Sequence, residues 1–145
     1  MPATERLRVV LDTNVYVAAF HKPSGAHAGI VLAAFNGRFT AVLSPAIVKE
    51  LANVLRTDLR WPEESVQGAL RDVAAAAEVI SPRTRINVLT DPDDNRILEC
   101  AVDGEADLIV SNDHHLLALK EWERIPIIAG PDFRRMILHP RRTTK

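Results

Sequence analysis

The sequence predicts an α/β fold in which helices cover both faces of a parallel, roughly five-stranded sheet. Short apolar segments alternate with helical patterns of about 10–15 residues, which is typical of βαβ units. The 145 residues are enough for one domain with its own core and too few for two. Strands are expected at residues 8–11, 40–43, 78–80, 108–110 and 125–128.

The helices are predicted from capping residues and hydrophobic spacing. Ser44 and Pro45 supply an N-cap and a first-turn proline for a helix whose apolar stripe includes Ile47. Asn14 is expected to cap a short helix after the first strand, and Gly37 to end a helix that begins near residue 26. Further helices are expected at about 62–77, 92–103 and 116–119 and from 130 onward, whereas 86–89 is read as a short extended segment.

Charge is nearly balanced over the whole chain. Eighteen Lys and Arg residues face nineteen Asp and Glu residues, so no global basic field indicates nucleic-acid binding. The stretch from residue 134 to 145 differs, because it contains no acidic residue and five basic ones: Arg134, Arg135, Arg141, Arg142 and Lys145. Such a tail can attract phosphates, although a frayed terminus is the simpler reading. We expect one domain over residues 1–137 and a basic tail over 138–145.

Cys100 is the only cysteine, which excludes an intrachain disulfide and favours the reducing cytoplasm. It falls among small and apolar residues of a predicted helix, so we interpret it as part of the core. The sequence contains neither the apolar segment of a signal peptide nor a stretch that could span a membrane.

Acidic residues recur where predicted strands and helices meet. Asp12 and Asp113 each follow a strand, and parallel strands bring their carboxyl ends to one edge of a sheet. Glu50 lies two turns into a helix that starts at the same edge. Asp94 lies in the first turn of another helix, which the segment 86–89 can lead to that edge. We therefore expect these four carboxylates to converge.

Four carboxylates in one pocket cannot all stay ionised without a partner, because like charges raise each other's pKa. Divalent cations remove this repulsion, and ligands that offer oxygen alone select hard ions such as Mg²⁺ or Mn²⁺. One or two such ions can generate hydroxide from water and stabilise the leaving oxygen of a phosphodiester. The residue types thus favour metal-dependent phosphoryl hydrolysis.

Each acidic residue also has a simpler structural interpretation. Asp91 is a good N-cap before Pro92, and local capping accounts equally well for Asp94. Asp113 can cap the next helix, and Glu50 alone is typical of a surface residue beside an apolar stripe. Asp12 is the hardest to explain in this way, because a carboxylate that ends a buried strand is costly without a partner.

Four segments together resemble a known family: residues 9–14 (VVLDTN), Glu50 after Ser44 and Pro45, residues 91–101 (DPDDNRILECA) and residues 109–113 (IVSND). In order and spacing they resemble the PIN domain family, and within it the toxin components of bacterial toxin–antitoxin systems. The resemblance extends from residue 8 to about residue 137. It implies a three-layer α/β/α sandwich whose first and fourth strands are adjacent.

The resemblance also implies a ribonuclease that depends on Mg²⁺ or Mn²⁺, with an RNA substrate, an antitoxin partner and a homodimer. Carried over by position, the catalytic and metal-binding residues are Asp12, Glu50, Asp94 and Asp113, with Asn14 and Ser111 in supporting roles. The chain departs from the family around the last aspartate, where Asn112, His114 and His115 stand. The two histidines are interpreted as bystanders in a surface turn.

Candidates for RNA binding are spread over the chain. Arg38, Arg56, Arg60 and the basic tail offer positive charge, and Trp61 and Tyr16 are candidate stacking residues. A second hypothesis is a PIN-like module that binds RNA or protein without cleavage, which the intact acidic quartet disfavours. A phosphatase of the phosphoaspartyl type is disfavoured because Asn14 stands where a second aspartate is needed.

Overall fold

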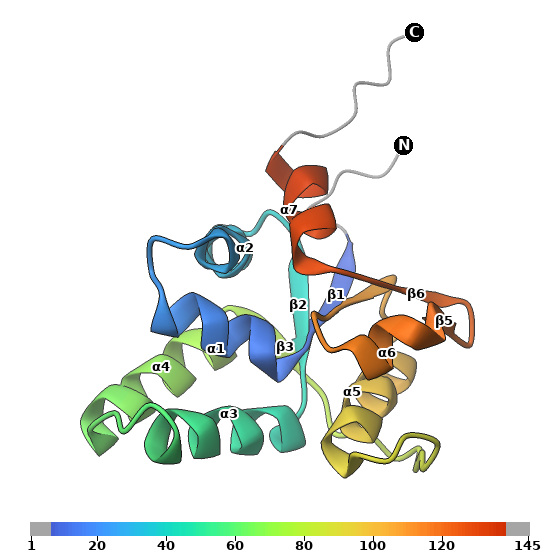
Figure 1. Cartoon of the computed structure of the whole chain (residues 1–145), viewed down its shortest axis with the longest axis horizontal. Helices are drawn as coiled ribbons and strands as arrows, with labels where there is room; N and C mark the ends of the chain where they lie inside the picture. The colour runs from blue at the N-terminus through green and yellow to red at the C-terminus, as the bar shows by residue number, and fades with distance from the viewer. Residues whose placement is uncertain (1–6, 139–145) are drawn as a thin grey trace, which may run out of the picture.

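The computed structural model describes residues 7–138, which form a sheet of six strands with helices on both faces (Figure 1). The strand order is β3-β2-β1-β4-β6-β5, and every neighbouring pair is parallel except β5 with β6. The three-layer α/β/α fold is therefore confirmed. The strands are β1 (Arg8–Leu11), β2 (Thr40–Leu43), β3 (Ala77–Val79), β4 (Leu108–Val110), β5 (Glu121–Trp122) and β6 (Ile125–Ile128).

Seven helices connect the strands within the described residues. They are α1 (Thr13–His21), α2 (Ala26–Phe35), α3 (Pro45–Thr57), α4 (Glu63–Ala75), α5 (Pro92–Asp103), α6 (His114–Leu119) and α7 (Gly130–Leu138). Ser44 caps α3 through its hydroxyl, which accepts the amide of Ile47, and Gly37 follows α2 with a φ of 74°. Both were predicted. The predicted cap of α1 was wrong: Asp12 is the N-cap residue and Asn14 lies inside the helix, because the chain turns into α1 directly after β1.

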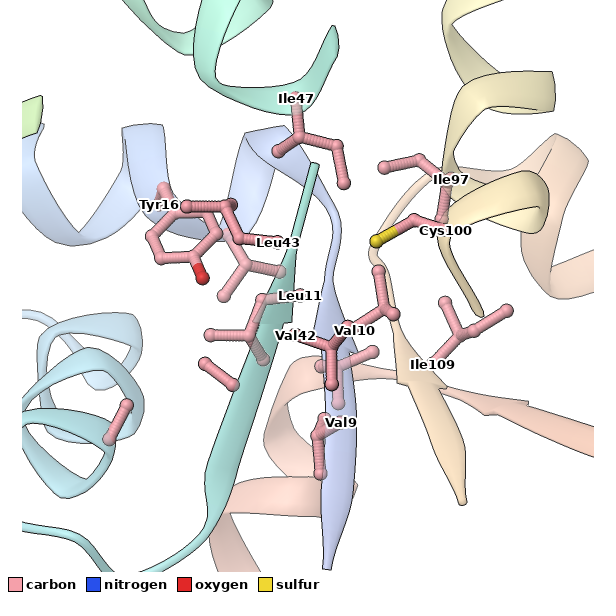
Figure 2. Close-up of a cluster of buried hydrophobic side chains, with 14 of the residues drawn as sticks. Val9, Val10, Leu11, Tyr16, Val42, Leu43, Ile47, Ile97, Cys100 and Ile109 are labelled. Atoms are coloured by element: carbon pink, nitrogen blue, oxygen red, sulfur yellow. The ribbon is translucent and has the colours of Figure 1, made fainter. Parts of the chain in front are cut away.

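The core lies on both faces of the central strands. Figure 2 shows Leu11 on the side of the Tyr16 ring and Val10 on the opposite side, beside Cys100 of α5. This alternation follows from the two-residue period of a strand, and it lets β1 contact both helical layers. Val10, Leu11 and Cys100 are fully buried, as expected for a central strand and a cysteine of the core.

The sequence prediction missed one strand, β5, which pairs with β6 in an antiparallel hairpin. Its two turn residues, Glu123 and Arg124, have φ values of 48° and 71°. Such a turn is usually marked by Asn-Gly or Asp-Gly, because those residues adopt positive φ at little cost. Without that signal the hairpin could not be recognised from the residues.

The segment 86–89 is extended but belongs to no strand. Three side chains of α5, spaced four residues apart, accept hydrogen bonds from backbone amides of this segment and of the residues before it. Asn95 accepts the amides of Val88 (3.1 Å) and Leu89 (2.9 Å), Glu99 accepts that of Ile86 (2.8 Å), and Asp103 accepts those of Arg83 (2.5 Å) and Thr84 (2.7 Å). The side chains of α5 thus take the place of a neighbouring strand and fix the approach to α5.

The last helix, α7, ends at Leu138, so residues 139–145 of the predicted basic tail lie outside the described residues. Arg134 and Arg135 are exposed on α7. Within residues 7–138, no helix has the length and apolar character required to cross a membrane.

Replacement of Asn95 by alanine is expected to lower the free energy of unfolding by about 2 kcal/mol, since it leaves two part-buried backbone amides and one carbonyl without their partner. Asn95 is 1% exposed, and its side-chain nitrogen also donates to the carbonyl of Leu89. Urea unfolding measures the effect, with Asn87→Ala as the control because Asn87 is exposed on the same segment. Equal losses in both variants would contradict this role of Asn95.

Candidate metal centre

The four predicted acidic residues line one pocket of about 160 Å³ at the edge where β1 leads into α1 (Figure 1). Strand ends deliver two of them and helices deliver the other two, as the sequence predicted. Exposed Asn14 also contributes to the rim. The complete lining is Asp12, Thr13, Asn14, Val17, Glu50, Val54, Asp91, Asp94 and Asp113.

Asp12 and Asp113 are linked by the hydroxyl of Ser111. Ser111 Oγ donates to Asp12 Oδ2 at 2.6 Å and accepts the backbone amide of Asp113 at 2.9 Å. The link is possible because β1 and β4 are neighbours, with Leu11 paired to Val110. Ser111 is fully buried and does not line the pocket, so it positions the acidic groups from behind.

The carboxyl group of Asp12 is nearly buried, with 5% of the residue exposed. Burial raises its pKa to about 6; the hydrogen bond from Ser111 opposes this shift, and the neighbouring carboxylate of Asp113 adds to it. Asp12 therefore carries its negative charge at a real cost, which a bound cation would reduce.

Glu50 is held in the pocket by Thr13, whose hydroxyl donates to Glu50 Oε1 at 2.8 Å. Burial raises the pKa of Glu50 to about 7, against the effect of this hydrogen bond, and the Asp93 carboxylate adds to the shift. The sequence interpretation gave Thr13 no role of its own. Its position directly after Asp12 was the available signal, but the contact with α3 depends on packing that the residues do not reveal.

Asp94, in the first turn of α5, faces the carboxylates of the two strand ends. Burial raises its pKa to about 7, and repulsion from Asp113 is the next largest cause. Asp91 accepts the amide of Asp93 at 2.9 Å, which confirms it as the N-cap, and it also lines the pocket. Asp93 lies outside this pocket and lines an adjoining hollow with Glu50.

Asp113 has both of the roles considered for it. Its Oδ1 caps α6 by accepting the amides of His115 (2.7 Å) and Leu116 (3.3 Å), and the residue lines the pocket. His114 and His115 are exposed beside it, and one ligand atom of each lies within 4.8 Å of the others and of an Asp113 oxygen. The histidines therefore flank the acidic pocket.

The pocket has a strong deficit of positive charge. Within residues 7–138, no lysine or arginine forms an ion pair with Asp12, Glu50 or Asp94. Carboxylate oxygens are the donors that Mg²⁺ and Mn²⁺ prefer, and several in one half-buried pocket can hold such an ion. The donor types thus fit a hard divalent cation, while among the described residues only Asp113, His114 and His115 have ligand atoms that all lie within 4.8 Å of one another.

The structure does not bring the expected RNA-binding residues to this pocket. Tyr16 is buried in the core with 1% exposure, and the Trp61 ring packs edge-on against Phe20 with centroids 5.9 Å apart. Arg56 pairs with Glu63, and Arg38 donates to the carbonyl of Ile137. Arg60 is exposed between α3 and α4. None of these five residues lines the pocket, and residues 139–145 of the basic tail lie outside the described part of the chain.

Raised carboxyl pKa values make the metal-free protein less stable as the pH rises. Between the ordinary aspartate pKa of about 4 and the value of about 7 for Asp94, the folded chain binds more protons than the unfolded chain. The free energy of unfolding therefore falls over this range. We expect Asp94→Asn, which cannot ionise, to gain stability relative to the parent between pH 5 and pH 8.

Urea unfolding in excess chelator at the two pH values measures this gain. Asp72→Asn is the control, because Asp72 is exposed on α4. A difference between parent and Asp94→Asn that does not change with pH would show that Asp94 ionises as freely in the folded protein as in the unfolded chain.

Several solved structures share the fold of this chain. One similar chain comes from the crystal structure of VapBC2 from Rickettsia felis, in which VapBC2 is bound to a DNA fragment from its promoter. The TM-score is 0.60, and the identity is 17% over 85% of this chain and 98% of that one. It is also similar to the PIN domain endonuclease Utp24, with a TM-score of 0.54 and 18% identity over 88% of each chain. PAE2754 from Pyrobaculum aerophilum is similar with a TM-score of 0.53 and 14% identity over 94% of this chain and 92% of that one.

Sequence comparison is more specific. The uncharacterized protein MJ1680 from Methanocaldococcus jannaschii is 30% identical over 120 residues, which is 80% of this chain and 77% of that protein. The family model for the PIN domain matches residues 8–115, a range that contains all four acidic residues of the pocket. The chain therefore belongs to the PIN domain family, whose members are known as metal-dependent nucleases.

Proposed function

We propose that this protein is an endoribonuclease that hydrolyses phosphodiester bonds in RNA with Mg²⁺ or Mn²⁺. The observation that carries the proposal is the convergence of Asp12, Glu50, Asp94 and Asp113 on one pocket. Three of these carboxyl groups have pKa values raised to between about 6 and about 7, mainly by burial. An array of this kind is stable in its ionised form only with a cation, and family membership supports nuclease chemistry.

In this proposal the four carboxylates hold the cation, and the remaining groups keep them in place. When bound, the cation supplies Lewis-acid chemistry for the attacking water and the leaving oxygen of an in-line displacement. Ser111 fixes Asp12 relative to Asp113, and Thr13 fixes Glu50. Asn14, at the exposed rim, is placed to contact a water molecule or the substrate.

The alternative, a module that binds RNA or protein without cleavage, has no use for this arrangement. Binding alone does not require two hydroxyl groups that orient buried carboxylates. It also gains nothing from carboxyl groups whose burial raises the cost of ionisation. The geometry of the pocket therefore favours the catalytic proposal.

We extend the proposal to regulation by a partner. The fold likeness to a chain of VapBC2 supports a toxin that is neutralised by an antitoxin protein, and a homodimer is proposed with it. The buried single cysteine is compatible with a reducing cytoplasm as the place of action. The toxin role rests on the proposed cleavage of RNA, whereas the homodimer does not.

Replacement of Asp12 by asparagine is expected to reduce RNA cleavage at least about a hundredfold, because it removes a charged ligand from the centre of the pocket. Excess chelator should have the same effect on the parent, and Mg²⁺ or Mn²⁺ should reverse it. Cleavage of a labelled RNA measures both, with circular dichroism to show that the fold is retained. Asp72→Asn is the matched control; parental cleavage by Asp12→Asn would refute the assignment.

Within the acidic run of α5, Asp94→Asn is expected to reduce cleavage more than Asp93→Asn. The two residues are adjacent in sequence, but Asp94 shares the pocket with Asp12 whereas Asp93 lines the neighbouring hollow. Initial rates at saturating Mn²⁺ compare the variants. Equal losses would mean that the metal-binding member of this run is misassigned.

A further inference from the structure

Beyond Glu50, further hollows adjoin the acidic pocket along α3 and α5, two helices that pack against each other. Glu50 lines both the acidic pocket and an adjoining hollow of about 250 Å³. That hollow shares Ala46 and Arg96 with a third hollow of about 230 Å³, which ends at the segment around Ser81 and Arg85. We call these three neighbouring hollows, which share lining residues, the groove; it starts at the proposed site of cleavage.

The groove is built from one face of each helix. Residues 46, 49, 50 and 53 of α3 recur at intervals of three or four, and residues 93, 96 and 99 of α5 recur at intervals of three. Such spacing places each set on a single side of its helix. The segment 81–85 closes the far end. It is held there by hydrogen bonds that the backbone amides of Arg83 and Thr84 donate to Asp103.

Away from Glu50 the accessible charge of the groove is mainly positive. Lys49 and Arg85 are exposed, with the Arg85 side chain 77% exposed and 3.9 Å from the buried carboxylate of Glu99. Arg96 separates two hollows, and its Nη2 donates to Glu99 (2.8 Å) and to the carbonyl of Ile86 (3.0 Å). Asp93 is the exposed acid on this path.

We infer that single-stranded RNA leaves the acidic pocket along this groove, with Lys49 and Arg85 binding the phosphates next to the one that is cleaved. The inference rests on the proposed function and adds the path and class of its substrate. Hollows of this size fit a strand one nucleotide wide rather than a duplex. Their lining contains no aromatic ring, so contacts to the phosphate backbone dominate and sequence preference here is weak.

Binding of a labelled single-stranded RNA to Asp12→Asn protein, which cannot cleave it, tests the inference. Adding Lys49→Gln and Arg85→Gln should weaken binding about tenfold and reduce the slope of log affinity against log salt by about 1.4, or about 0.7 for each lost phosphate contact. Lys22→Gln with Arg71→Gln in the same background is the matched control, because both residues are exposed outside the groove. Thermal unfolding verifies that both proteins are folded.

Three outcomes would overturn the inference. The groove and control variants could bind the RNA with equal affinity, the Asp12→Asn protein could show no measurable RNA binding, or it could bind duplex RNA as tightly as single-stranded RNA. Cleavage assays in the Asp12 parental background separate it from the proposed function. A raised KM with kcat retained in Lys49→Gln/Arg85→Gln supports the groove. Groove-dependent binding by a protein that never cleaves RNA would refute the proposed function and leave the groove intact, whereas cleavage with an unchanged KM would refute the groove alone.

Discussion

The pairing of β1 with β4 is the constraint on which the candidate site depends. These strands are far apart in sequence, yet the register of Leu11 with Val110 brings Asp12 and Asp113 to the same edge. A single buried hydroxyl, that of Ser111, then connects the carboxylate of Asp12 to the backbone amide of Asp113. Because Asp12 and Ser111 directly follow the two central strands, the buried strands of the core fix where these side chains meet.

The two helical acids are positioned less directly. Glu50 reaches the pocket because α3 packs against α1, where Thr13 supplies its hydrogen bond. Asp94 reaches it because the polar side chains of α5 hold the preceding segment in an extended path. Each acid is therefore tied to a neighbour that performs no chemistry. Burial then raises the pKa values of these acids and makes the pocket responsive to a cation.

Most of the fold follows from local sequence signals. The short apolar segments that alternate with helical patterns identify the strands correctly. Ser44 and Pro45 mark the start of α3, and Gly37 marks the end of α2. The strand ends also predict that Asp12 and Asp113 meet, since parallel topology leaves little choice. The β5 hairpin could not be predicted because Glu123 and Arg124 carry no turn signal. The role of Thr13 and the path of segment 83–89 depend on contacts between elements that no local pattern encodes.

In the attachment of that segment to α5, the residues that fix its path differ from those that form its outer surface. Most of these bonds are made to backbone amides, whereas the side chains of Thr84, which donates to Asp103, and of Ile86, which is buried, add contacts of their own. Asn87 and Val88 point their side chains outward and are exposed. The side chains of these two residues can therefore be changed without removing a hydrogen bond that holds the segment, which leaves the outer surface beside the pocket open to substitution. The path of the segment is thus determined largely by residues of α5 that lie after it in the sequence.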